Sequence, residues 1–435
     1  MFTLLALCCS TAVNAQEIDL TRYVGTVDQS NPLNVSFSAV PGSGRLLIGD
    51  GADAVTLELN GTDIALTENA PTPVSLQATN TLRATSQQTV RIRIKQVADI
   101  ELHVLSRVHF NTNVSDFEAA RAFYGTLGFE TLSGFPDANT VAMAEAIGVT
   151  APTEYDGSQG GEAGGYLLHG ELIGVGGFSG GVIDLIEFTI PRNDEPPYDA
   201  VNHLGMARAV MHSVDLQADY ARLSAAGVKF VSSPARRSDG TLFALFTDLD
   251  GTFYELAEIP GERDADSDSQ IVGLGHLNIN VSDFERSAAW YQMLGYEITR
   301  SLPAEESGAA AAAMGFSAPY RINGAILTHV EDGSTIELVE WLSPRDTRPP
   351  YPIPVNHLGI HRTAFSTTDI EADVAALKAQ GVKFVSEITP CCDGPDSWGS
   401  IVSFYDPDGT IVELVEQPIM NAVFRVMRFF SNLFD

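Results

Sequence analysis

Basic residues are scarce in this chain of 435 residues, with 25 lysines and arginines against 56 aspartates and glutamates. The formal net charge of −31 repels a phosphate backbone, which excludes nucleic acid as an expected partner. Cysteine is also scarce, with four in the whole chain. Because Cys391 and Cys392 are neighbours, they cannot join distant segments, which argues against a disulfide scaffold. They are either two thiols or a vicinal disulfide.

A long apolar run is missing after the N-terminal residues, because no later segment has the roughly 20 apolar residues that span a bilayer. Residues 1–15 resemble a secretory signal instead. Phe2 to Ala12 is largely apolar, and small residues precede Gln16. We therefore predict a signal peptide over 1–15 and a periplasmic or extracellular location.

The chain contains an internal repeat in five blocks. The first block begins at His109 and returns at His276, and the last block is an Asp-x-Asp-Gly-Thr motif. The blocks occur in the same order in both copies, which indicates two tandem copies of about 150 residues. The paired blocks are 107–118 with 274–285, 196–205 with 349–359, 227–232 with 381–386, and 248–252 with 406–410, together with Tyr124-x-x-Leu127-Gly128 and Tyr291-x-x-Leu294-Gly295.

Each copy reads as two half-units of the order strand, helix and three strands. A strand over 108–113 precedes a helix that starts after Ser115 or Asp116 and ends at Gly128. The fold class that follows is α+β, with two tandem copies of paired βαβββ modules. We place the first module at 104–260, an acidic linker at 261–270 and the second module at 271–417.

The two ends of the chain differ from the modules. Residues 16–103 have short alternating runs between turn signals such as Asn60-Gly61, which predicts a small all-β sandwich with an accessory role. Residues 418–435 are apolar, with Arg425 and Arg428 on one side, and predict an amphipathic helix. This helix either docks on the protein body or lies peripherally on a membrane surface.

The modules resemble the vicinal oxygen chelate superfamily, which includes glyoxalase I, bleomycin resistance proteins and extradiol dioxygenases. The resemblance rests on the opening His-x-Asn-x-Asn-Val-Ser-Asp segment, the Leu-Gly helix end and the closing Asp-Gly-Thr-x-x-Glu-Leu segment. It implies a divalent metal in a cup between two curled half-sheets. It does not select a reaction, because one fold hosts many chemistries.

Carried over position by position, the resemblance implies a set of metal ligands on the first and last strands of the half-units. Fe, Mn, Zn, Ni and Mg are not distinguished. The implied ligands are His109, Asp184 and Glu255 in the first copy, and His276, Glu337 and Glu413 in the second. Because Glu337 reaches further than Asp184, the second copy is the better candidate. The cups form either within one copy or between halves of different copies.

The fourth ligand position departs from the family pattern. Arg208 and Arg362 stand where the family commonly has histidine, and arginine offers no lone pair to a metal. The arginines indicate either a metal-free ion pair with the glutamates or a fork that binds a carboxylate-bearing substrate. Both copies also contain a Pro-Pro-Tyr motif and an Asn-His motif. These motifs include Tyr198 in the first copy, and Tyr351 and His357 in the second. They form either a structured crossover or the rim of the cup, where His357 would act with Glu413 in catalysis.

Two ligand-binding functions follow from these residues, beside a third hypothesis of a structural or interaction protein with vestigial cups. The first is an exported, divalent-metal-dependent lyase, isomerase or dioxygenase that acts on a small oxygen-rich substrate. The second is a metal-free protein that binds or sequesters a small molecule, in the manner of the resistance proteins. The expected partner is a small molecule in either case, and an oligomer is not required because the modules are already paired.

Overall fold

The computed structural model describes residues 102–417 apart from 393 and 395, together with the backbone of seven strands between Tyr23 and Gln96. The chain divides into two compact units, 1–99 and 100–435. The predicted signal peptide over 1–15 and the predicted C-terminal helix over 418–435 lie outside the described residues. No helix among the described residues is long and apolar enough to cross a membrane.

The elements recorded in the first unit are all strands. They form a four-stranded sheet of order β1-β7-β4-β3 and a three-stranded sheet of order β2-β6-β5. In the first sheet, Asn60 pairs with Asp63, next to the predicted turn signal. The strands are β1 Tyr23–Asp28, β2 Leu47–Ile48, β3 Thr56–Asn60, β4 Asp63–Thr67, β5 Ser75–Gln77, β6 Thr81–Arg83 and β7 Val90–Gln96.

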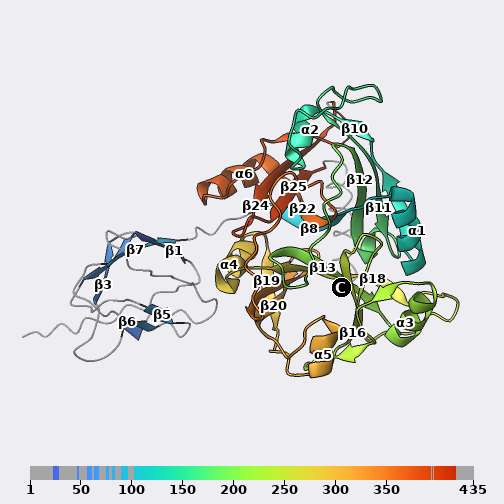
Figure 1. Ribbon diagram of the computed structural model, residues 1–435. Helices are drawn as coiled ribbons and strands as arrows, with labels where there is room; N and C mark the ends of the chain where they lie inside the picture. The colour runs from blue at the N-terminus through green and yellow to red at the C-terminus, as the bar shows by residue number, and fades with distance from the viewer. Residues whose placement is uncertain are drawn as a thin grey trace, which may run out of the picture. The chain divides into compact units, whose positions relative to one another are not determined.

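The second unit contains both copies of the repeat, and the βαβββ order of each half-unit is confirmed (Figure 1). The main elements of the first copy are β8 Val104–Asn113, α1 Phe117–Leu127, β9 Glu130–Gly134, β11 Tyr166–Gly174, β12 Val182–Ile190, β13 Gly205–Ser213, α3 Leu216–Ala225, β16 Leu242–Thr247 and β17 Phe253–Glu258. Its short elements are β10 Ala138–Asn139, α2 Val141–Ala146, β14 Lys229–Phe230 and β15 Ala235–Arg236. Within the repeated block 227–232, strand β14 is only two residues long.

The second copy repeats this order. Its elements are β18 Ile271–Asn280, α4 Phe284–Met293, β19 Tyr296–Ser301, α5 Gly308–Ala313, β20 Arg321–His329, β21 Thr335–Ser343, β22 Gly359–Thr367, α6 Ile370–Ala379, β23 Thr389–Cys391, β24 Gly399–Tyr405 and β25 Ile411–Glu416.

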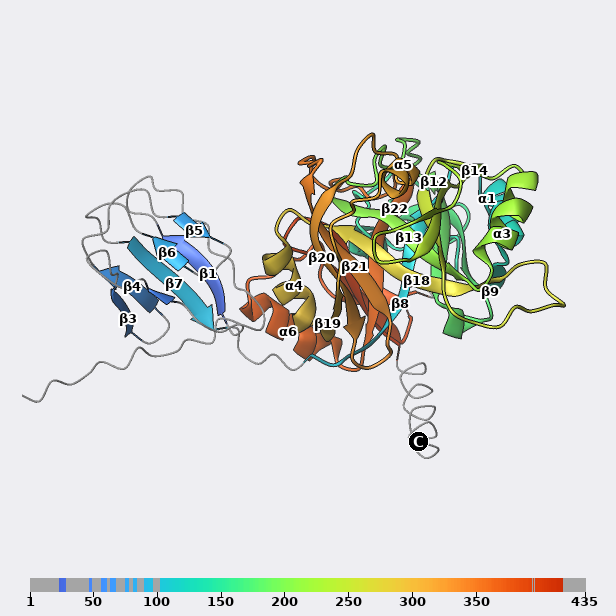
Figure 2. The same cartoon turned by 90° about the horizontal axis from the view of Figure 1, so that it is seen from below.

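The two copies exchange halves to build their sheets. One nine-stranded sheet contains β11, β12 and β8 of the first copy beside β22, β25 and β24 of the second. The other contains β16, β17 and β13 of the first copy beside β18, β21 and β20 of the second. The junctions are the antiparallel pairs β8–β22 and β13–β18. In Figure 2 the long strands of the two copies run side by side. Each sheet is therefore shared between the copies.

The two ends of helix α1 are determined by its local sequence. The Asp116 carboxylate accepts the backbone N–H of Ala119 at 3.0 Å, so Asp116, one of the two predicted caps, starts the helix. Gly128 ends it with φ of 100°, a left-handed conformation that suits glycine. Tyr124 lies on the buried face and donates its hydroxyl to Asp248 at 3.1 Å. The closing Asp-x-Asp-Gly turn is thus bonded to the opening helix of the same copy.

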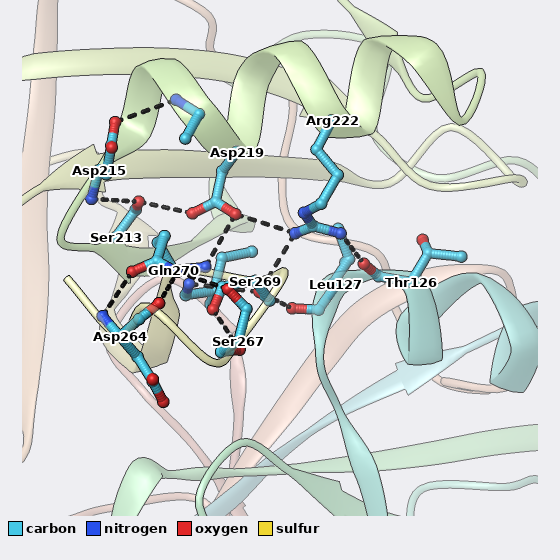
Figure 3. Close-up of polar contacts among 12 residues, drawn as sticks. Thr126, Leu127, Ser213, Asp215, Asp219, Arg222, Asp264, Ser267, Ser269 and Gln270 are labelled. Carbon is cyan, nitrogen blue, oxygen red and sulfur yellow. Dashed lines mark hydrogen bonds and ion pairs between the residues drawn. The ribbon is translucent and has the colours of Figure 1, made fainter.

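A buried aspartate fastens the start of the second copy (Figure 3). Asp219 of α3 is completely buried and accepts hydrogen bonds from the Ser213 hydroxyl at 2.7 Å and the backbone N–H of Gln270 at 3.0 Å. Arg222 donates to the same carboxylate at 2.9 Å and to Ser269 at 3.1 Å. Residues 261–266 are exposed, as expected for a linker, but its last residues are held against α3.

Replacing Asp219 with alanine should lower the free energy of unfolding by about 2–3 kcal/mol, because it leaves several buried donors without an acceptor. Urea denaturation measures the loss, and Asp266→Ala in the exposed linker serves as the control, with an expected change within about 0.5 kcal/mol. Equal losses in the two variants would contradict this role. The equivalent Asp373 of α6 accepts the backbone N–H of His103 at 2.9 Å, so Asp373→Ala should behave like Asp219→Ala.

Candidate functional site

The predicted site residues gather in two cups, one on each large sheet. We name them by their arginines. The Arg362 cup consists of His109 on β8, Asp184 on β12, Arg362 on β22 and Glu413 on β25. The Arg208 cup consists of His276 on β18, Glu337 on β21, Arg208 on β13 and Glu255 on β17. Each cup is therefore built from residues of both copies, and neither copy contains a complete cup. The expectation that the second copy holds the better site does not apply, because each cup takes half of its residues from each copy.

The Arg362 cup is a buried but incompletely paired cluster. Nε of Arg362 lies 2.8 Å from Oε1 of Glu413, and Nη2 lies 3.6 Å from Oδ2 of Asp184. The first contact is an ion pair by distance, but its N–H is not aligned for a hydrogen bond. Nδ1 of His109 is 3.9 Å from Asp184. Five buried side-chain atoms have no hydrogen-bond partner here: Nδ1 of His109, Oδ1 of Asp184, Nε and Nη1 of Arg362, and Oε1 of Glu413.

The electrostatics of this cup favour uncharged side chains around Arg362. Burial raises the pKa of Asp184 to about 7, with Arg362 opposing the rise and Glu413 adding to it. Burial also raises the pKa of Glu413, although Arg362 again opposes the rise. Burial and the neighbouring guanidinium lower the pKa of His109 to about 3, so this imidazole is neutral at physiological pH. One guanidinium therefore does not fully compensate two carboxylates.

The Arg208 cup is paired more completely, although Nη1 of Arg208 also lacks a hydrogen-bond partner. Arg208 donates from Nε to Glu255 at 3.1 Å and from Nη2 to Glu337. Arg237 donates to both oxygens of Glu255, at 2.6 and 2.8 Å, and its guanidinium carbon lies 3.9 Å from the centre of the Phe243 ring. Two guanidinium groups thus face two glutamates, in contrast to the single guanidinium of the other cup.

Arg237 was missed by the sequence reasoning, which compared only the blocks that both copies share. The signal that could have revealed it lies in the repeat itself. Counting from the shared Val-Ser pairs at 231–232 and 385–386, Arg237 aligns with Cys391. The two cups therefore differ at this position, where the first copy has an arginine and the second has a cysteine.

Pairing in the Arg208 cup changes its acid–base behaviour. Burial opposes ionisation of Glu255, but Arg237 and Arg208 outweigh it and lower the pKa of Glu255 to about 2. Burial lowers the pKa of His276 to about 4 although both glutamates oppose the change. Together with Tyr320 and Met314, these residues line a cavity of about 50 Å³.

Comparison with known proteins agrees with this arrangement. The family model for the Glyoxalase/Bleomycin resistance protein/Dioxygenase superfamily matches residues 106–256 and 273–414. The chain belongs to this superfamily. A single-substitution variant of glyoxalase I from Zea mays is 18% identical, with a TM-score of 0.51, and the match covers 73% of this chain and 94% of that one. This likeness shows the shared fold.

Other solved structures are similar at lower scores. Glyoxalase I from Zea mays, without the substitution, is 18% identical, with a TM-score of 0.48 and coverage of 74% of this chain and 95% of that one. A putative dioxygenase from Bacillus subtilis is 14% identical, with a TM-score of 0.46 and coverage of 73% and 87%. No curated protein matches the sequence.

The superfamily implies a divalent metal, but the donor sets of both cups fit one poorly. Each cup offers one histidine and two carboxylates, and an arginine stands in the fourth position. Arg362 contacts Asp184 and Glu413, so a cation would have to compete with a fixed positive charge for the same oxygens. Among the described residues no group of three His, Cys, Asp or Glu side chains is placed to hold a metal ion. We therefore derive no chemistry through a metal.

The tyrosines and histidines of the repeated Pro-Pro-Tyr and Asn-His motifs form a stack of rings. The ring centres of Tyr198 and Tyr351 are 4.3 Å apart, and those of Tyr351 and His357 are 3.8 Å apart. The Tyr198 hydroxyl accepts the backbone N–H of Tyr351 at 3.0 Å. Burial lowers the pKa of His357 to about 4, so its ring is neutral at pH 7. The rings of the two motifs thus contact one another across the two copies.

Proposed function

We propose that this superfamily member binds a small, oxygen-rich molecule directly in the Arg362 cup, without a metal ion between protein and ligand. One observation carries the proposal: five buried polar atoms of the cup lack hydrogen-bond partners. Buried polar groups are normally satisfied, and each unsatisfied group costs about 1–3 kcal/mol. A ligand that supplies the missing partners recovers this free energy when it binds.

The chemistry of these atoms defines the ligand class. Nη1 of Arg362 is a donor, which suits a carbonyl oxygen. Oδ1 of Asp184 and Oε1 of Glu413 are acceptors when ionised, which suits a hydroxyl group. The ligand that satisfies both is a molecule with neighbouring carbonyl and hydroxyl oxygens. A dianion is disfavoured, because two carboxylates already surround one guanidinium. The expected ligand is therefore a neutral molecule or one with a single negative charge.

The Arg208 cup supports the same assignment by contrast. Arg237 and Arg208 together satisfy Glu255, whereas Glu413 faces a single guanidinium. We therefore assign the ligand to the Arg362 cup. Asp184, with a pKa of about 7, is able to accept or give a proton to a bound hydroxyl at neutral pH.

Hydroxyacetone, a neutral hydroxycarbonyl compound, is a direct probe of this proposal. Calorimetric titration should detect its binding to the purified full chain, and excess EDTA should not change the affinity. Arg362→Gln should weaken binding at least tenfold, because it removes the donor that meets the carbonyl. The matched variant Arg208→Gln, in the other cup, should leave the affinity within twofold.

A second variant is needed because Arg362→Gln disturbs a buried ion cluster and could reduce binding by causing misfolding. Asp184→Asn keeps the size of the side chain and should also weaken binding. Unchanged affinity in both variants would overturn the proposal. Stoichiometric metal in the purified protein, together with binding that EDTA abolishes, would also overturn it in favour of a metal-dependent enzyme.

A further inference from the structure

Two neighbouring cysteines end strand β23 next to the Arg362 cup. Cys391 and Cys392 are joined by a disulfide in this structure. Cys391 is completely buried, whereas Cys392 is half-buried and so within reach of small reagents. Cys391 pairs with Gly399 on β24, and β24 pairs with β25, which carries Glu413. The cysteines therefore lie two strands from a residue of the cup.

Strand register gives the cysteine pair an exact counterpart in the other cup. On β15 Ala235 pairs with Phe243, and on β23 Thr389 pairs with Ile401, which are the matching residues of the two copies. Counting two residues onward, Cys391 occupies the place of Arg237. In the Arg208 cup that place supplies two of the three side-chain hydrogen bonds to Glu255. In the Arg362 cup the same place holds a cysteine.

The cysteine pair is also connected to the cup through its backbone. The carbonyl oxygen of Cys392 accepts a hydrogen bond from the Asn139 side chain at 3.0 Å. Asn139 lies directly before the cap of helix α2, and Cys391 packs in one apolar cluster with α2 residues and Tyr166. The same cluster contains Ala364 of β22 and Val415 of β25, which lie two residues from Arg362 and Glu413 and so on the same strand faces. A change at the cysteines thus reaches the cup through a packed contact.

We propose that Cys391 and Cys392 form a two-electron redox site in the wall of the Arg362 cup, and that the disulfide form binds ligand more tightly than the dithiol form. In the reduction, a dithiol reductant gives up two electrons and two protons and closes into its own disulfide. The bond between the two sulfur atoms breaks, and each sulfur takes one proton. The affinity part of this inference rests on the proposed function, whereas the redox part does not.

Packing gives the direction of the effect. Two thiol sulfurs cannot approach as closely as two bonded sulfurs, so reduction requires more room. Cys391 is fully buried in the cluster that also contains Tyr166, and close-packed interiors offer little spare space. Reduction therefore requires the packed side chains around Cys391 to move, and we expect this movement to disturb the neighbouring cup.

The redox part is tested on the full chain equilibrated in mixtures of reduced and oxidised dithiothreitol. The protein is quenched in acid, unfolded and labelled with a maleimide, and the peptide that contains Cys391 and Cys392 is weighed by mass spectrometry. The expected result is a two-label step with a single midpoint. A peptide that carries two labels in every mixture, or none in any, would overturn the redox site.

The coupling is tested by titrating hydroxyacetone into the oxidised and the reduced protein. We expect at least a threefold weaker affinity after reduction, and a Cys391→Ser, Cys392→Ser double variant that binds like the reduced protein in both buffers. Equal affinity in the two states would overturn the coupling. Absence of binding in both states would instead refute the proposed function and, with it, the coupling, while the labelling result for the redox site would stand by itself.

Discussion

A Glu255→Gln variant should lose about 3 kcal/mol of unfolding free energy at pH 7. The pKa of Glu255 is lowered from 4.5 to about 2 in the folded protein, because Arg237 and Arg208 outweigh the cost of burial. At about 1.4 kcal/mol per pKa unit, this shift corresponds to about 3 kcal/mol. The stabilisation is fully present above pH 4.5 and is lost as the pH falls toward 2. Glutamine removes the charge and leaves two buried guanidinium groups poorly compensated.

The matched control is Glu413→Gln at the equivalent position of the Arg362 cup. Burial raises the pKa of Glu413, so its ionised form does not stabilise the fold at neutral pH. We expect this variant to unfold within about 1 kcal/mol of wild type, or to be more stable. Urea denaturation of both variants at pH 7 measures the difference. Equal losses would show that the two cups are electrostatically alike and would refute the role given to Arg237.

The second large effect has the opposite sign. An Asp184→Asn variant should gain up to about 4 kcal/mol at pH 8, because the pKa of Asp184 rises from 3.8 to about 7 in the folded protein. Between these two values the folded state holds a proton that the unfolded state has released. Wild-type stability therefore falls as the pH rises from about 4 to 7, and asparagine removes this loss.

Unfolding curves at pH 4 and pH 8 measure this gain. The two proteins should differ little at pH 4, where the carboxyl group is largely protonated in the folded state. The advantage of Asp184→Asn should appear only at the higher pH, and the surface variant Asp266→Asn should show no such dependence. A loss of stability at pH 8 would mean that the ionised carboxylate is needed to compensate Arg362. The same variant is expected to bind hydroxyacetone poorly, so stability and binding would trade against each other at one residue.

The sequence by itself determined the repeat, the half-unit order and the residues that face the cups. Local signals suffice for these features, because they depend on neighbours along the chain. Asp116 and Gly128 set the ends of α1, and strand alternation separates Arg362 from His361. The family resemblance pointed to Asp184 and Glu413, and the structure brings both to Arg362. The family resemblance supplied the set of positions to compare.

Only the tertiary structure decided which halves share a sheet. His109 could have joined either Arg208 or Arg362, because β13 and β22 carry nearly the same pattern. The pairing of β8 with β22 joins residues more than 200 positions apart, and no local signal specifies it. The same exchange brings Arg237 to Glu255 and a cysteine pair to the cup of Glu413. Burial increases the electrostatic difference between the two cups. In a buried cup the charge of one additional guanidinium, such as that of Arg237, changes the ionisation of the neighbouring side chains.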